Sequence, residues 1–282
     1  MTTQNRDIIT SFSNPVVKKL RSLERKKGRT ESGLFLAEGT RLVAQGLSLG
    51  WRADTLMAAS TALDRPHVKS LLADAEKTGT RIVEVPERLL EKVSRKDNAQ
   101  VVIAAFEQQS RDLKDMPAQD DGIWLGLYCV RDPGNLGTIL RTADCAGVAG
   151  VVLIDTCCDP YSVEAVRASM GSIFDIPFAS ADFGAFNDWR KQAGLHMVAA
   201  SVNGTVRHDD PIYSSKTMIL MGNEQSGLPA PVESACDVLS IIPMRGGADS
   251  LNLAQATAIM TYEAWRQKGF TCLLYTSDAA DD

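Results

Sequence analysis

The chain has 282 residues, of which 44% are hydrophobic and 23% are charged, and this fits one large globular domain or two modest ones. No apolar run reaches transmembrane length, and the first residues, MTTQNRDIITSF, lack the apolar core of a signal peptide. We therefore expect no membrane association and a cytoplasmic location.

The formal net charge of −5 is unevenly distributed. Residues 1–30 carry eight basic residues against two acidic ones, a balance of +6, so the remaining residues carry −11. A basic arm on an acidic body is either a solvated helix face or a local binding surface for phosphate groups. The sequence by itself leaves both interpretations open.

The first predicted helix begins at Asn14-Pro15, because proline suits the first helical turn. Its apolar residues Val16, Val17, Leu20 and Leu23 are spaced for one face, and Gly28 is expected to end it. Strands and helices then alternate. The expected strands are 33–39, 55–58, 81–85 and 101–106, and the expected helices are 40–50, 66–77 and 87–93. The sequence thus predicts a compact α/β domain over residues 1–107.

Residues 108–121, QQSRDLKDMPAQDD, have little apolar content and include a proline, so we interpret them as a linker. A second alternation, over residues 122–271, predicts an α/β domain with a mostly parallel sheet. The expected strands are 123–130, 150–154, 175–178, 196–200, 218–221 and 238–242. The expected helices are 136–146, 163–169, 183–192, 231–234 and 252–268.

The last eleven residues, CLLYTSDAADD (272–282), change in character. They resemble translated sequencing-adaptor sequence, and we exclude them from the fold as a suspected non-native tail.

Three polar stretches follow predicted strands of the second domain: VRDPGNLGTILRTADCAG (130–147), MGNEQSG (221–227) and IPMRGGADSLNLAQA (242–256). In parallel sheets, ligands bind at the carboxyl ends of strands. The first stretch sets Asn135 in a glycine-rich turn and Arg141 six residues later inside a helix, a pair with no evident structural purpose. The second stretch, around Glu224, could also be an ordinary polar loop, and Ser250 and Asn252 could simply cap the helix that follows them.

The sequence lacks the motifs of several common ligand-binding and catalytic sites. No GxGxxG follows the first strand of either domain, no GxxxxGK[ST] occurs, and the histidines are scattered. The six cysteines lack a CxxC pair or a neighbouring histidine, so we predict no metal site and reduced thiols.

With these stretches in order, the chain resembles the SpoU (TrmH-type) branch of the SPOUT methyltransferases. The family motifs match at DPGNLGTILRTAD, MGNEQSGL and IPMRGGADSLNLAQA, and YSVEAVRASMGSIFDIPF (161–178) resembles the segment after the first motif. SNPVVKKLRSLERKKGR and FLAEGTRLV resemble the family's L30e-like substrate-binding domain.

The resemblance implies an α/β protein with a small N-terminal L30e-like domain and a C-terminal SPOUT domain that contains a trefoil knot. It implies transfer of a methyl group from S-adenosylmethionine to a ribose 2′-hydroxyl of RNA, by a homodimer. The cofactor would contact Gly222, Ile242, Met244 and Leu251.

The catalytic set that the resemblance implies is Asn135, Arg141, Glu224, Ser250 and Asn252. A guanidinium stays protonated near neutral pH, so we expect Arg141 to clamp an RNA phosphate and stabilise developing oxyanion charge. Asn135 and Glu224 would orient Arg141 and the ribose, while Ser250 and Asn252 would hold the phosphate or the loop. The residues expected to bind RNA are Lys18, Arg25, Lys26, Lys27, Arg29 and Arg167.

Ribosomal RNA is the expected substrate, because the two-domain layout resembles the family's ribosomal-RNA members more than its compact transfer-RNA members. The same chemistry on transfer RNA is one alternative. The other is a non-catalytic RNA-binding assembly protein, against which the intact Asn135, Arg141, Glu224 and Asn252 count.

Overall fold

The computed structural model describes residues 7–94, 100–109, 111–116 and 122–270. Compact packing divides the chain into two units. The first contains Met1–Gln109, Leu136–Arg141 and Asp159–Asp175, and the second contains Ser110–Asn135, Thr142–Cys158 and Ile176–Asp282. The suspected tail at 272–282 lies outside the described residues.

The first unit is built on a five-stranded mixed sheet with the order β1-β4-β3-β5-β2. Strands β1, β4 and β3 are parallel, and β5 runs antiparallel to both of its neighbours. The strands are β1 (Asp7–Ile8), β2 (Leu34–Glu38), β3 (Ala53–Ala59), β4 (Arg81–Val85) and β5 (Val102–Glu107). The central strands are nearly all apolar because both faces of this sheet are covered.

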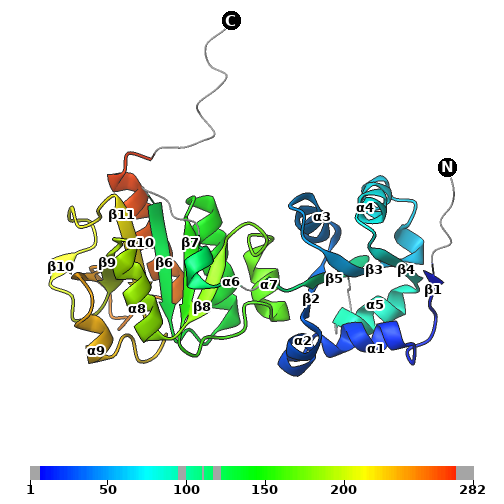
Figure 1. Cartoon of the computed structure of the whole chain (residues 1–282), viewed down its shortest axis with the longest axis horizontal. Helices are drawn as coiled ribbons and strands as arrows, with labels where there is room; N and C mark the ends of the chain where they lie inside the picture. The colour runs from blue at the N-terminus through cyan, green and yellow to red at the C-terminus, as the bar shows by residue number, and fades with distance from the viewer. Residues whose placement is uncertain (1–6, 95–99, 110, 117–121, 271–282) are drawn as a thin grey trace, which may run out of the picture. The chain divides into compact units, whose positions relative to one another are not determined.

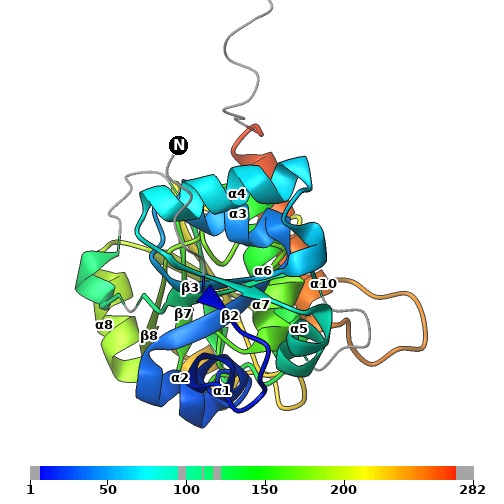
Figure 2. The same ribbon diagram turned by 90° about the vertical axis from the view of Figure 1, so that its right-hand side faces the viewer.

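Helices lie on both faces of that sheet. Figures 1 and 2 show α3 and α4 on one face and α1, α2 and α5 on the other. Their bounds are α1 (Pro15–Ser22), α2 (Lys26–Ser32), α3 (Thr40–Ser48), α4 (Pro66–Lys77) and α5 (Glu87–Ser94). The alternation expected from the sequence is confirmed for this unit.

The N-terminal helix differs from its prediction. It is two helices, because α1 ends at Ser22 and α2 runs from Lys26 through Gly28 to Ser32. Gly28 is therefore not a helix end. A Cβ at Gly28 would lie 2.1 Å from the Ser22 carbonyl oxygen, so glycine is needed here for the close approach of α2 to the end of α1. The left-handed residue that ends α2 is Gly33, with φ 67°.

The segment Asp159–Asp175, which includes α7 (Val163–Ser169), packs within the first unit although it lies far along the chain. The ring of Phe174 lies 5.1 Å from that of Trp51 in an edge-on arrangement, and Trp51 Nε1 donates to the Phe174 carbonyl at 2.9 Å. Phe35 and Phe106 complete this aromatic cluster. The chain that follows the first polar stretch thus contributes core residues to the first unit.

The second unit has a seven-stranded sheet with the order β10-β12-β9-β11-β6-β7-β8, and every pairing described in it is parallel. The strands are β6 (Gly122–Tyr128), β7 (Gly150–Ile154), β8 (Phe178–Ala181), β9 (His196–Ala200), β10 (Val206–Arg207), β11 (Lys216–Met221) and β12 (Val238–Ile241). The helices that begin after residue 130 are α6 (Pro133–Cys145), α7, α8 (Phe183–Gln192), α9 (Ala230–Glu233) and α10 (Leu253–Gln267). A mostly parallel α/β domain is confirmed.

The core of this unit consists of two layers, one on each face of the sheet, because alternate side chains along a strand point to opposite faces. Trp124, Met218 and Leu220 pack with Phe186 of α8 and Val232 of α9. Helix α10 contacts β6 and β11, and its buried Met260 and Ala264 are absent from that cluster. We infer that α10 covers the opposite face, because successive strand residues point to opposite faces.

One strand prediction for this region is wrong. Residues 175–177 are not a strand, because Phe174 and Asp175 donate backbone hydrogen bonds three residues back in a turn, and β8 begins only at Phe178. The segment interpreted as a linker is not wholly outside the core. It contains a 3-10 turn, η2 (Leu113–Asp115), followed by Met116, which is 6% exposed and packs in the core of the second unit.

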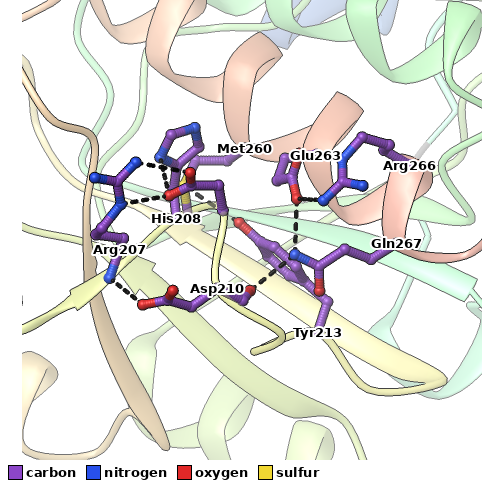
Figure 3. A network of polar contacts seen from close by, with 9 residues as sticks. Arg207, His208, Asp210, Tyr213, Met260, Glu263, Arg266 and Gln267 are labelled. Carbon is purple, nitrogen blue, oxygen red and sulfur yellow. Dashed lines mark hydrogen bonds and ion pairs between the residues drawn. The ribbon is translucent and has the colours of Figure 1, made fainter.

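A polar network attaches the loop after β10 to α10 (Figure 3). Gln267 Nε2 donates to the Asp210 carbonyl at 2.8 Å and to Glu263 Oε1 at 2.7 Å, and the Tyr213 hydroxyl donates to Met260 Sδ at 3.5 Å. Burial raises the pKa of the Tyr213 hydroxyl, so it stays a neutral donor. These contacts anchor the C-terminal half of α10, whose first turn carries Asn252. Among the described residues, no helix is both long and apolar enough to span a membrane.

Candidate active site

The three polar stretches come together at one edge of the second sheet. Strands β6 and β11 are direct neighbours, and β12 lies beyond β9, all in parallel. Their carboxyl ends therefore meet at the same edge, as expected for a ligand site in such a sheet. The loop before α6 follows β6, Glu224 follows β11, and Asn252 begins α10 after β12.

The Glu224 carboxylate is the centre of this edge. It accepts hydrogen bonds from the backbone N–H of Arg131 at 3.1 Å and of Asp132 at 3.0 Å, and from Asn135 Nδ2 at 3.3 Å. One acidic side chain from the loop after β11 thus holds the whole turn that enters α6. Asp132 caps that helix by accepting from the Asn135 N–H at 2.7 Å.

The surroundings of Glu224 favour its ionised form. Partial burial would raise the pKa of this carboxyl, but the N–H groups of Asp132 and Arg131 and the amide of Asn135 together lower it below its ordinary value. A carboxylate that is stabilised in this way is a weak proton acceptor. We therefore interpret Glu224 as an orienting group.

A chain of amide hydrogen bonds extends from Glu224 to α10. Asn252 Oδ1 accepts from the N–H groups of Ala254 and Gln255 at the start of α10, at 2.9 and 3.3 Å. Asn252 Nδ2 donates to Asn135 Oδ1 at 2.9 Å, and Asn135 Nδ2 donates to Glu224 Oε1. Since every bond has one donor and one acceptor, the chain fixes the orientation of both amide groups.

The hydrogen bonds that join Asn252, Asn135 and Glu224 leave N–H donors of the two asparagines for a ligand. Each asparagine Nδ2 carries two N–H groups, and within the described residues only one of them is engaged at Asn135 and at Asn252. Asn252 is exposed and Asn135 is half-buried. The two amides therefore offer fixed donors at the surface, of the kind that binds a hydroxyl or phosphate oxygen.

The structure joins Asn135, Glu224 and Asn252 of the predicted catalytic set by direct hydrogen bonds, but not the other two candidates. Arg141 lies on α6 six residues after Asn135, about 9 Å along the helix axis. It is exposed and makes no hydrogen bond or ion pair among the described residues, so its guanidinium is available to a ligand. Ser250 is exposed and caps no helix, because Asn252 is the cap of α10.

A cavity of about 560 Å³ opens beside Glu224. Gly222, Ile242, Met244 and Leu251, the residues expected to contact the cofactor, all line it. So do Ser201 and Val202 after β9 and Gln225 and Ser226 after Glu224, which the sequence analysis did not identify.

The loop after β11 forms the polar wall of this cavity. Asn223 and Gly227 exchange backbone hydrogen bonds at 3.0 Å each, and a Cβ at Gly222 would lie 2.5 Å from the carbonyl carbon of Gly227. Glycine is required at 222 because any side chain would push the loop apart.

These residues fit the methyl donor that the sequence resemblance implies. The cavity volume is within the range of sites for ligands of this size. Its apolar walls from Ile241, Ile242, Met244 and Leu251 suit a purine ring, and Asp249 and Glu224 supply negative charge for a cationic ligand.

Besides these lining residues, two side chains that hold the loops of the site in place were not predicted: Asp132 and Asn223. The Asp-Pro pair at 132–133 is a helix-start signal that could have identified the cap. Nothing in the sequence distinguishes the tertiary role of Asn223, whose Nδ2 donates to the Cys129 carbonyl at 2.7 Å.

The basic residues of the first unit fall into two groups. Lys18, Arg25, Lys26 and Lys27 are exposed, and Lys18, Arg25 and Lys27 line an open pocket of about 330 Å³ together with Arg21, which was not predicted. This group is able to meet a polyanion.

Arg29 and Arg167 belong to the second group, which is committed to internal partners. The Arg29 side chain is 4% exposed, pairs with Asp159 at 2.7 Å, and donates to the carbonyls of Leu23 and Glu24. Arg167 is bidentate on Glu38, at 2.7 and 2.8 Å. Burial of Arg29 contradicts a direct RNA contact, and we correct that prediction: its role is to join α2 to residue 159.

The cysteines take no part in a metal site in the described structure. Cys129, Cys145, Cys157, Cys158 and Cys236 are free thiols, and no cluster of three metal-ligating side chains occurs among the described residues. Burial is the main cause that raises the pKa of the Cys158 thiol to about 12, with the negative charge of Glu224 adding to it. The thiol therefore stays protonated beside the site.

Comparison with known proteins gives matches over both units. A family model described as the SpoU rRNA Methylase family matches residues 122–262, and one described as the MRM3-like substrate binding domain matches residues 14–104.

A solved structure, the AdoMet-bound rRNA methyltransferase from Sinorhizobium meliloti, is 43% identical with a TM-score of 0.87, covering 93% of this chain and 98% of that one. The 23S rRNA (uridine(2479)-2'-O)-methyltransferase of Streptomyces viridochromogenes is 32% identical, over 87% of each chain. The 23S rRNA (guanosine(2553)-2'-O)-methyltransferase RlmP of Bacillus subtilis is 30% identical, over 90% of this chain and 97% of its own.

Proposed function

The chain belongs to the SpoU rRNA methylase family and is an S-adenosylmethionine-dependent RNA ribose 2′-O-methyltransferase, and we propose that its substrate is ribosomal RNA. Within the site, the main support for this function is the series of hydrogen bonds that joins Asn252, Asn135 and Glu224 beside the cavity after β11. The preference for ribosomal RNA rests on relatives that carry this activity in their names and align over both units.

When bound, the cofactor supplies a methyl group on a sulfonium leaving group. The chain must therefore align a ribose hydroxyl for in-line attack and exclude competing orientations. Asn135 and Asn252 do this through their remaining N–H groups, whose directions the hydrogen-bonded chain fixes. Glu224 holds the Asn135 amide and the turn before α6 in place.

Arg141 has a different role in the proposal. A guanidinium stays charged at neutral pH, so it binds an RNA phosphate and stabilises negative charge that develops on the attacking oxygen. Its exposure and its lack of a partner among the described residues support this role. Ser250, exposed at the rim of the cavity, is proposed to hold the phosphate or the loop before α10.

RNA is also proposed to contact the first unit through Lys18, Arg21, Arg25, Lys26 and Lys27. Arg167, whose side chain is 30% exposed and paired with Glu38, lines a different pocket, and any RNA contact of its own would be through the exposed part of its side chain. The family resemblance further implies a trefoil knot in the second unit, a homodimer and a cytoplasmic location, which we retain as proposals. Light scattering of the purified protein would test the dimer.

The test of the proposed function uses labelled S-adenosylmethionine with two unmodified transcripts, 23S ribosomal RNA and a transfer RNA pool. We expect label in the ribosomal RNA and a single mapped 2′-O-methyl site. Label in transfer RNA alone would establish the first alternative. Cofactor binding without label in either RNA would establish the non-catalytic alternative.

Arg141→Ala in the same assay should reduce transfer by about 100- to 1000-fold, the cost typical of losing one charge-stabilising group. Cofactor affinity should stay within about twofold, because Arg141 does not line the cofactor cavity. Arg141→Lys keeps the charge without the planar fork and should recover part of the activity. Loss of cofactor binding in Arg141→Ala would show that the proposed role is wrong.

A further inference from the structure

We propose that Asn223 is a positioning residue that locks the RNA-side turn before α6 to the cofactor-side loop after β11. This inference rests on the proposed function, and it assigns a role to a side chain that neither binds substrate in the proposal nor belongs to the predicted catalytic set. Asn223 lines the cavity together with its neighbours Gly222 and Glu224, and Glu224 also orients the catalytic amides.

The two ends of the Asn223 amide serve different loops. Its Oδ1 accepts from the N–H groups of Gln225 and Ser226 at 3.0 and 3.1 Å, and from the Ser226 hydroxyl at 3.2 Å. These bonds shape the turn on the cofactor side. Its Nδ2 donates to the Cys129 carbonyl at 2.7 Å, and this bond reaches the loop after β6.

The bond to Cys129 falls at a strained position. Cys129 has φ 53°, the left-handed conformation that residues with a Cβ adopt at a cost. This conformation takes the chain out of strand β6 and into the turn at Arg131 and Asp132, whose N–H groups bind Glu224. The Asn223 amide holds the Cys129 carbonyl in that conformation, so it determines where the two N–H groups point.

Adjacent residues of one loop therefore bind successive residues of the other: Asn223 binds Cys129, and Glu224 binds Arg131 and Asp132. Glu224 supplies an ionised acceptor, and Asn223 supplies the donor. No other residue described in the loop 222–227 donates a side-chain hydrogen bond to the loop after β6.

The variant Asn223→Asp separates the two halves of this role. A carboxylate keeps the acceptor for Gln225 and Ser226 but has no N–H for the Cys129 carbonyl, and it sets a charged oxygen 2.7 Å from that carbonyl oxygen. The cofactor-side turn should persist while the RNA-side turn loses its alignment. Asn223→Ala removes both sets of bonds.

The experiment measures single-turnover transfer to the 23S ribosomal RNA transcript and S-adenosylmethionine affinity by calorimetry. For Asn223→Asp we expect transfer to fall about 10- to 100-fold, the cost of leaving the half-buried Cys129 carbonyl without its donor, with cofactor affinity within about threefold because the turn at Gln225 and Ser226 keeps its acceptor. For Asn223→Ala we expect both to fall. Asn187→Asp is the matched control, since Asn187 lies on α8 and only accepts from Arg190 Nε, and it should behave as the wild type.

Two outcomes would overturn the inference. One is unchanged transfer in Asn223→Asp. The other is a parallel loss of cofactor affinity, transfer and melting temperature in Asn223→Asp, which would assign Asn223 to general stability. If the wild type itself fails to label RNA, the proposed function fails, and that result is separate from either outcome for Asn223.

Discussion

The Glu224 site of the second unit and the basic segment of the first unit use charge in different ways. At the site, one carboxylate is held by two backbone N–H groups and an amide, without an ion-pair partner in the described structure. In the basic segment, Arg29 is buried on Asp159 and Lys19 pairs with Asp54 at 2.9 Å, while Lys26 is exposed. Neighbouring residues of one sign therefore differ, because some pair with carboxylates of the protein and others are left exposed.

This difference shows why a charge count is a poor guide to a binding surface. The eight basic residues within positions 1–30 look alike in the sequence, but burial divides them. A buried guanidinium that satisfies its donors on protein oxygens has no donor left for a phosphate.

Arg29→Ala should destabilise the protein by about 3–5 kcal/mol, because it removes the cation paired with the Asp159 carboxylate and the donor to the carbonyls of Leu23 and Glu24. Lys27→Ala, two residues away and 84% exposed at its side chain, should change stability by no more than about 0.5 kcal/mol. Urea unfolding measures both. Equal urea midpoints for Arg29→Ala and Lys27→Ala would show that Arg29 stabilises the protein no more than an exposed lysine does.

Glu224→Gln should lower kcat/KM by about 10- to 100-fold, since a neutral amide offers one oxygen and a competing donor to the N–H groups of Arg131 and Asp132. Cofactor affinity should fall by a smaller factor than transfer, because Glu224 lines the cavity and contributes negative charge to it. Steady-state transfer assays measure kcat/KM, and calorimetry measures cofactor affinity. Glu233→Gln is unsuitable as a control, because Glu233 binds Ser201, which lines the cavity, and Asn203. Glu76→Gln on α4 of the first unit is the better control. A wild-type rate for Glu224→Gln would refute the orienting role.

Lys26→Ala with Lys27→Ala should weaken RNA binding several-fold at low salt and flatten its salt dependence. Each lost phosphate contact should reduce the slope of log K against log salt by about 0.7 to 0.9. Lys69→Ala, whose side chain pairs with Asp64 on the first unit, is the control and should leave the slope unchanged. An unchanged slope in the double variant would show that Lys26 and Lys27 lie on a solvated helix face and do not contact RNA phosphates.

The smallest expected effect is the dependence of stability on pH through Glu224. Its pKa in the folded state is lowered, so its contribution is complete above the ordinary glutamate value near 4.3 and is lost as the pH falls through the folded-state pKa. The stability difference between wild type and Glu224→Gln should therefore be constant from pH 7 to about 5 and shrink below about 4.3. A difference that grows on acidification would contradict the assigned direction.

The positions of the polar residues at the ends of strands and the starts of helices were predictable from the local sequence. Asn135, Glu224 and Asn252 each follow a strand or begin a helix, and parallel strands must bring their carboxyl ends to one edge. The residues expected from the family resemblance to contact the cofactor, Gly222, Ile242, Met244 and Leu251, all line the cavity. Hydrogen-bond partners such as Asn223 with Cys129 were not predictable, because 94 residues separate them.

By itself, the sequence determined the alternation of helices and strands, the parallel sheet, the family and most of the polar residues at the strand ends, since each depends on periodicity, turn chemistry or a contiguous motif. The tertiary structure decided which of those polar groups bond to one another, that Arg29 is buried, and that Asp159–Asp175 packs in the first unit. Burial and pairing depend on chain segments far apart in the sequence, 89 residues for Asn135 with Glu224 and 130 for Arg29 with Asp159, and no local pattern carries that information.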